Sequence, residues 1–251
     1  MEFKTGISAL TETDMIIRGV KLSELISQST FSNSIFLILT GRIPKETESS
    51  IFNALLVSCI DHGMGVASSM SARFVASTGT PLNSSVAAGI LALGEKHGGA
   101  AEQAMLIFEE ILKCVSNTSD QYAVVESYVR QTLKKNRTLY GFGHAVYKDA
   151  DPRVTQILTL CDEQHYQPKS LGIAMDVASA LESLKSKKIC LNVDGLMAAL
   201  LLDMGFTPVQ ARGVFIIART PGLVAQSIEE QQEGKLRRIE EKEINYVQEK
   251  K

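Results

Sequence analysis

The chain has 251 residues, of which 45% are hydrophobic and 22% charged, so it is long enough for one large globular unit with a substantial core. A formal net charge of −2 gives the protein no strong overall electrostatic field. It therefore argues against partners that such a field attracts, such as nucleic acid or a membrane surface. The first residues lack the pattern of a secretion signal, and no apolar run reaches the roughly 18 residues of a membrane span.

Four cysteines are scattered among apolar residues without a Cys-x-x-Cys pair, so we expect buried free thiols and no metal site. They are Cys59, Cys114, Cys161 and Cys190. Free thiols fit a reducing compartment, and the expected location is the cytoplasm.

Apolar residues recur at helical spacing along almost the whole chain, which predicts an all-α fold in one compact unit. The first predicted helices cover residues 21–28, 32–40, 46–60, 68–76 and 83–93. Later ones cover residues 102–114, 120–135, 152–161, 169–184 and 193–204, with one short extended piece expected at 188–192.

Near the C-terminus, Thr207 and Pro208 combine a helix N-cap with a first-turn proline. They predict a last long helix that runs to about residue 226. Residues 235–251 mix charges of both signs, which is typical of a solvated tail or of one more helix.

The loop at residues 141–153 reads GFGHAVYKDADPR and places His144 between two glycines. Glycine lets the backbone adopt positive φ and approach a ligand closely. Asp151 is suited to cap the next helix and Pro152 to its first turn, so Arg153 lies at a helix N-terminus that favours anions. From spacing alone, a binding loop and a glycine-rich connector with a surface histidine fit equally well.

Three of the four histidines, His62, His97 and His144, occur beside glycine where a predicted helix gives way to a loop. A favourable interaction with the helix dipole explains each one singly, but explains the three together less well. His165 lies in a plain polar connector and is expected to be inert.

Asp194 is a carboxylate inside an apolar stretch, where it must be paired, hydrogen-bonded or shifted to a higher pKa. Such a group suits a general base, and an N-cap of the helix from residue 195 fits the pattern at least as well. Arginine side chains can clamp carboxylates in a bidentate fork or simply lie on the surface. The candidates are Arg153, Arg219 and one of the pair Arg237 and Arg238. Together these residue types indicate chemistry on an anionic carbonyl compound, without naming the reaction.

The loop GFGHAVYKDADPR resembles a motif of the citrate synthase superfamily, and other segments agree with that family in the same order. They are residues 17–25, 36–44, 61–63, 71–79, 97–100, 192–194 and 218–220. One departure is Ala101, where the family usually has asparagine. The resemblance covers nearly the whole chain and implies an all-α, citrate-synthase-like fold.

Citrate synthases usually carry a much longer segment between the motif ending at Pro44 and the turn at Asp61 than residues 45–60 provide. The short form, with Asn-Val-Asp-Gly-Leu at residues 192–196, looks like citryl-CoA lyase and the lyase module of ATP-citrate lyase. Those enzymes cleave citryl-CoA to acetyl-CoA and oxaloacetate. His97 favours a synthase over a lyase, because the ATP-citrate lyase module lacks a histidine at this turn.

Two activities therefore stay open, citryl-CoA lyase and a small citrate or 2-methylcitrate synthase, beside an inactive relative that binds CoA or partners. The resemblance implies a catalytic set of His97, His144 and Asp194. Asp194 exchanges a methyl proton, His97 binds the thioester oxygen, and His144 handles the proton of the oxaloacetate carbonyl. The expected substrate-carboxylate ligands are His62, Arg153, Arg219 and Arg238.

The resemblance also implies that a CoA thioester and oxaloacetate or citrate are substrates, without a metal or a tightly bound cofactor. It implies a homodimer with no nucleic-acid or membrane partner. Finally, it implies a large part at about residues 1–100 and 197–251 and a smaller mobile part at about residues 101–196.

Overall fold

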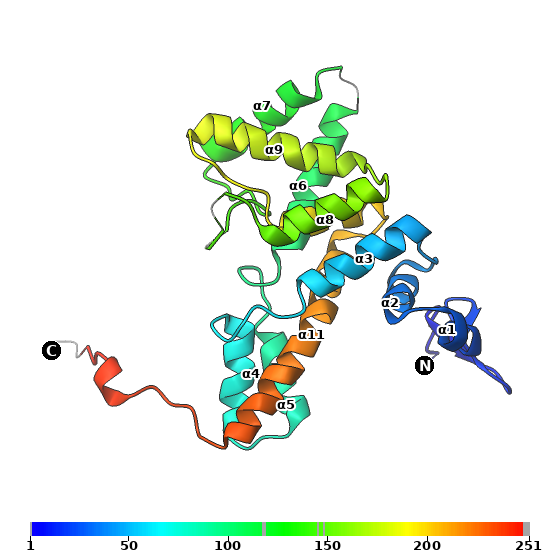
Figure 1. Ribbon diagram of the computed structural model, residues 1–251, viewed down its shortest axis with the longest axis vertical. Helices are drawn as coiled ribbons and strands as arrows, with labels where there is room; N and C mark the ends of the chain where they lie inside the picture. The colour runs from blue at the N-terminus through cyan, green and yellow to red at the C-terminus, as the bar shows by residue number, and fades with distance from the viewer. Residues whose placement is uncertain (1, 117–118, 145, 148, 248–251) are drawn as a thin grey trace. The chain divides into compact units, whose positions relative to one another are not determined.

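A computed structural model describes residues 2–116, 119–144, 146–147 and 149–247 of the chain (Figure 1). The described chain is mostly α-helical, so the predicted all-α class is confirmed. It divides into two compact units, which we call the first unit (Met1–Cys59 and Gly98–Ala218) and the second unit (Ile60–His97 and Arg219–Lys251). The two units are groups of residues that pack together. The smaller part expected at about residues 101–196 is instead defined by its movement relative to the rest of the chain, and it stays a prediction.

The first unit contains most of the helices. They are α1 (Leu22–Gln28), α2 (Phe31–Thr40), α3 (Glu46–Ser58), α6 (Ala100–Val115), α7 (Gln121–Lys134), α8 (Pro152–Glu163), α9 (Lys169–Lys185), α10 (Val193–Asp203) and the beginning of α11 (Pro208–Glu233). The core is built around α10, whose residues 195–201 are fully buried and which packs against α6 and α9. Its sequence is apolar on every face, as expected for a helix that is enclosed by others.

A three-stranded antiparallel sheet precedes the helices, in the order β1 (Ser8–Leu10), β2 (Met15–Ile17) and β3 (Val20–Lys21). The sequence interpretation missed it, because strands of two or three residues are too short to show an alternating pattern. The turn between β2 and β3 places Arg18 and Gly19 at φ +48° and +85°, the left-handed pair that suits a tight hairpin.

The second unit contains α4 (Ala67–Ser77), α5 (Leu82–Leu91), the rest of α11 and a 3₁₀ turn at Glu241–Glu243. Helices α4 and α5 lie side by side against α11 (Figure 1). Gly89 of α5 makes this packing close, because a Cβ there would lie 3.0 Å from the Ser68 carbonyl oxygen and 3.1 Å from Leu223.

Helix α11 continues through Pro221 to Glu233, beyond the predicted end near residue 226. The extra turns are polar in sequence, and tertiary ion pairs hold them. Glu230 is fully buried between Arg73 and Arg237, and Arg73 also reaches Glu229 at 2.6 Å. A hydrophobic pattern cannot reveal a helix end that depends on such pairs.

The chain after α11 is an exposed, largely irregular tail as far as residue 247, so a further α-helix at residues 235–247 is ruled out. The last four residues of the predicted tail, and Ala145 and Lys148 of the glycine-rich loop, lie outside the described residues. All four cysteines are free, but Cys114 is exposed and Cys190 half-buried, which corrects the expectation that every thiol is buried. No helix in the described ranges is long and apolar enough to cross a bilayer.

Candidate active site

The loop that carries His144 is anchored to the segment that leads into α10. The Gly143 amide donates to the carbonyl oxygen of Cys190 at 2.7 Å, and the Asn192 amide donates to that of Gly141 at 3.0 Å. Of the extended piece expected at residues 188–192, the structure shows one isolated antiparallel bridge, between Leu191 and Phe142. Residues 141–143 of the glycine-rich loop are therefore hydrogen-bonded to this segment.

Two glycines allow this loop and α10 to touch backbone to backbone. A Cβ on Gly141 would lie 2.6 Å from the Cα of Gly195, and a Cβ on Gly195 would overlap the carbonyl oxygen of Gly141. Gly141 also has φ +91°, which other residues rarely adopt. Neither position accepts a side chain without movement of the other segment.

His144 is held in one orientation and one tautomer. Its Nδ1 accepts the backbone amides of Val146 and Tyr147, both at 3.1 Å, and the Tyr147 ring stacks on the imidazole at 4.6 Å. Because an amide can only donate, Nδ1 keeps its lone pair, and we assign the proton of the neutral ring to Nε2. His144 thus presents an N–H donor on its other side.

Asp151 caps α8 as predicted and also fixes Arg153. Its carboxylate accepts the Arg153 backbone amide at 3.1 Å, Nε at 2.9 Å and Nη2 at 2.7 Å, and it accepts the Val193 amide at 3.2 Å. Burial alone would raise the pKa of Asp151, but the hydrogen bonds and charge of Arg153 outweigh it and hold that pKa below its ordinary value. The ion pair fixes the Arg153 guanidinium at the start of α8 through Nε and Nη2.

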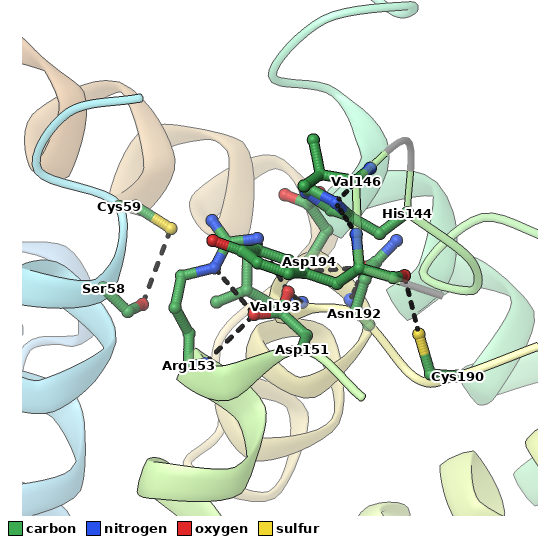
Figure 2. Close-up of polar contacts among 12 residues, drawn as sticks. Ser58, Cys59, His144, Val146, Asp151, Arg153, Cys190, Asn192, Val193 and Asp194 are labelled. Carbon is green, nitrogen blue, oxygen red and sulfur yellow. Dashed lines mark hydrogen bonds and ion pairs between the residues drawn. The ribbon is translucent and has the colours of Figure 1, made fainter. Parts of the chain in front are cut away.

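Asp194 lies in the first turn of α10, and Asn192 caps that helix. The Asn192 Oδ1 accepts the amides of Asp194 at 3.0 Å and Gly195 at 3.1 Å, so the alternative that Asp194 is the N-cap is wrong. Asp194 is close enough to help raise the pKa of Arg153, behind the larger effects of burial, which lowers it, and of Asp151. In the view of Figure 2, Asp194 lies between His144 and Arg153.

In the second unit, His97 is fixed by Ser68. The Ser68 amide donates to Nε2 of His97 at 3.3 Å, and the Ser68 Oγ lies 2.9 Å from the same atom. The neutral ring therefore carries its proton on Nδ1. Burial, followed by the positive charges of Arg219 and His62, lowers the pKa of His97, which keeps the ring neutral near pH 7.

The turn with His62 is held against α11. The carboxylate of Asp61 accepts the Gly63 amide at 2.9 Å and Nε2 of Gln226 at 3.2 Å. Gly222 of α11 has no room for a side chain, because its Cβ would overlap the carbonyl oxygen of Ile60. His62 itself is exposed, one residue beyond the fixed carboxylate.

The two candidate arginines of the tail behave differently. Arg237 forms an ion pair with the buried Glu230, with Nε and Oε1 2.5 Å apart, and reaches Glu233 at 3.1 Å. Arg238 is exposed on the tail, so it remains the better candidate for a substrate ligand.

A cavity of about 740 Å³ in the first unit opens beside His144 and is strongly basic. Its cationic lining residues are Arg137, Lys185, Lys187 and Lys188. No acidic residue is among the described residues that line it. Sequence reasoning missed this site, although the Lys-Ser-Lys-Lys run at residues 185–188 was a visible signal, because Arg137 and His144 come from another part of the chain.

The structure thus gathers His144, Arg153 and Asp194 in the first unit, and His62, His97 and Arg219 in the second. That both groups surround one substrate stays a prediction. Within the described ranges, no three or more histidine, cysteine, aspartate or glutamate residues are arranged to hold a metal ion.

Residues 45–240 match the family model for the C-terminal domain of citrate synthase. The chain belongs to the citrate synthase family. A citryl-CoA lyase from Hydrogenobacter thermophilus has the same fold with a TM-score of 0.91 and 39% identity, over 99% of this chain and 96% of that one. These findings confirm the family that the motifs predicted.

Curated relatives are longer than this chain. The citrate synthase of Helicobacter pylori is 36% identical over 75% of this chain but 44% of its own length. Human ATP-citrate synthase is 26% identical over 91% of this chain and 22% of its own length. The chain spans about half the length of the curated citrate synthases that it matches first.

Proposed function

We propose that this protein cleaves citryl-CoA to acetyl-CoA and oxaloacetate. The observation that carries the proposal is the likeness to the citryl-CoA lyase from Hydrogenobacter thermophilus, which is 39% identical with a TM-score of 0.91 over 99% of this chain. A second observation is the short segment between Pro44 and Asp61, which has room for one helix, α3. The short form therefore supports lyase activity.

His144 acts on the oxygen that is the hydroxyl of citryl-CoA and the carbonyl of oxaloacetate. Its fixed tautomer directs Nε2, and the proton on it, toward this oxygen. In condensation, Nε2–H donates its proton to the carbonyl oxygen. Cleavage is the reverse step: it starts from the ring whose Nε2 has lost that proton, and Nε2 takes up the hydroxyl proton as the carbon–carbon bond breaks. Such a transfer contributes about 10²–10⁴-fold to the rate. As the carbon–carbon bond breaks, its electron pair passes into the enolate of acetyl-CoA.

Asp194 moves the second proton. In cleavage, its carboxyl group protonates the methylene carbon of the enolate to give the methyl group of acetyl-CoA. His97 stabilises the same enolate, because its Nδ1–H donates to the thioester oxygen on which negative charge develops. A neutral imidazole suits this role, and the lowered pKa of His97 maintains that form.

The basic cavity beside His144 binds the CoA part of the substrate. Its four cationic side chains match the phosphate groups of CoA, and its position brings the thioester end toward the histidine. Nη1 of Arg153 is assigned to a carboxylate of the oxo acid, together with His62, Arg219 and Arg238. The thioester is a substrate, and no tightly bound cofactor is part of the proposal.

A homodimer belongs to the same proposal. Exposed apolar side chains of the second unit support it, since Met70 and Phe74 are 44% and 39% exposed on one face of α4 and Leu91 is 85% exposed at the end of α5. The cytoplasmic location stays a prediction.

A citrate or 2-methylcitrate synthase is the second candidate. His97 favours it, because its donor geometry is intact, and curated relatives such as the Helicobacter pylori protein are named citrate synthase. Both activities share the enolate, so they differ only in the fate of citryl-CoA. A lyase splits it, whereas a synthase hydrolyses it to citrate and free CoA.

One assay separates the two candidates. The purified protein is given citryl-CoA, and oxaloacetate and free thiol are measured in parallel. A lyase releases oxaloacetate without free thiol, whereas a synthase releases thiol from citryl-CoA and from acetyl-CoA plus oxaloacetate. If neither product appears from either substrate set, the protein is an inactive relative and the proposal is wrong.

A further inference from the structure

We propose that Asn192 is a positioning residue that holds the His144 loop and the start of α10 in one fixed relation. Its Nδ2 donates to the carbonyl oxygen of Gly143 at 2.8 Å, directly before His144 in the chain. Its Oδ1 accepts the amides of Asp194 and Gly195 at the first turn of α10. One side chain therefore binds the peptides next to both proposed proton carriers (Figure 2).

Only a carboxamide of this length meets both demands at once. Aspartate offers acceptors alone, so it can cap α10 but cannot donate to Gly143. Serine is also a good N-cap, but its side chain is one atom shorter. Asn192 is consequently more than a helix cap, since a cap needs only the acceptor.

The hydrogen bond from Asn192 to Gly143, which we call the tether, matters because it restrains a glycine. Gly143 has φ +78°, and glycine loses more conformational freedom than any other residue when it is fixed. Both polar groups of Gly143 are occupied, the amide by Cys190 and the carbonyl by Asn192. Without the hydrogen bond from Asn192 to the Gly143 carbonyl oxygen, the peptide that leads into His144 can rotate, and the imidazole no longer keeps one orientation.

The direct test is Asn192→Asp, which keeps the cap and replaces the donor by an oxygen that repels the Gly143 carbonyl. The effect on turnover depends on the proposed function, and a displacement on the order of 1 Å costs roughly 100-fold in rate. We expect kcat to fall about 10- to 100-fold while KM for the CoA thioester changes less than about 3-fold. Unchanged kcat in a folded variant overturns the proposal.

A double-mutant cycle shows whether Asn192 acts through His144. In the His144→Ala background, Asn192→Asp is expected to lower the residual kcat by less than about 3-fold, because the imidazole that Asn192 positions is already absent. A loss of the same size in both backgrounds contradicts a positioning role.

A second readout does not require activity. Histidine-labelled protein has four rings, and His144 is assigned by its loss in His144→Ala. We expect one Nε2–H tautomer in the wild type and an exchange-broadened ring signal in Asn192→Asp. An identical His144 spectrum in the variant overturns the tether. Absence of turnover in the wild type contradicts the proposed function and leaves this test standing.

Asn33→Asp is the matched control. Asn33 is also a half-buried asparagine of the first unit, and its Oδ1 accepts the Ser49 hydroxyl at 2.7 Å, a bond that aspartate retains. We expect this variant to keep the wild-type kcat and His144 spectrum. Equal losses in both variants would assign the effect to the added charge and not to the lost donor.

Discussion

The contact between Gly141 and Gly195 makes Gly195→Ala the sharpest test of the site geometry. The new Cβ would overlap the Gly141 carbonyl oxygen and lie 2.9 Å from its carbonyl carbon and 2.7 Å from Cδ1 of Leu191. Two of these atoms are backbone, so rotation of a side chain cannot relieve the overlap. Relief to an ordinary van der Waals separation requires the loop to retreat on the order of 1 Å.

That retreat has two expected consequences. Overpacking in a close-packed region lowers the free energy of unfolding by about 1–3 kcal/mol. Misplacement of His144 relative to Asp194 by on the order of 1 Å lowers kcat by roughly 100-fold. Denaturant unfolding measures the first effect, and turnover of citryl-CoA by the folded variant measures the second.

Gly213→Ala is the control, because Gly213 lies in α11 and its added Cβ would have no neighbour within 4 Å among the described residues, apart from adjoining residues and the backbone of its own helix. There, alanine in place of glycine should raise the free energy of unfolding by about 0.5–1 kcal/mol and leave kcat unchanged. Wild-type stability and turnover in Gly195→Ala would refute the claim that this contact sets the distance between loop and helix.

Three further predictions concern the site. Asp194→Ala or His144→Ala should each lower kcat by at least about 100-fold in the citryl-CoA assay. Lys187→Glu should raise KM for the CoA thioester with little change in kcat, and the effect should shrink at high salt because charge screening weakens it. His97 should titrate below its ordinary pKa of 6.5 in an NMR pH series, and Arg219→Gln should raise that pKa by removing a positive charge. Since protonation of His97 is disfavoured in the folded state, its contribution to stability is complete above pH 6.5 and is lost as pH falls through the lowered pKa.

Each of these has a control or an outcome that contradicts it. Activity within a few-fold of wild type removes Asp194 or His144 from the mechanism. Lys134→Glu adds the same charge at an exposed position of α7 outside the cavity lining, so an equal rise in KM there means that no specific site is involved. A His97 ring that titrates at its ordinary pKa contradicts the lowered value.

Local sequence patterns predicted much of the fold. The apolar spacing located all but the ends of α2 through α10, and the Asp-Pro-Arg turn correctly predicted both the Asp151 cap and the start of α8. These features depend on neighbours within a turn or two, so the sequence contains the information directly. The family motifs also identified the residues that the first unit gathers around Asp194.

Tertiary structure decided the rest. The side chain of Asn192, which caps α10, also donates to the carbonyl oxygen of Gly143, 49 positions away in the chain. The basic cavity joins Arg137 to the lysines at residues 185–188 across nearly 50 positions of sequence. A sequence lists the groups that can donate, accept or carry charge, but which of them meet depends on the packing of segments that are distant in the chain.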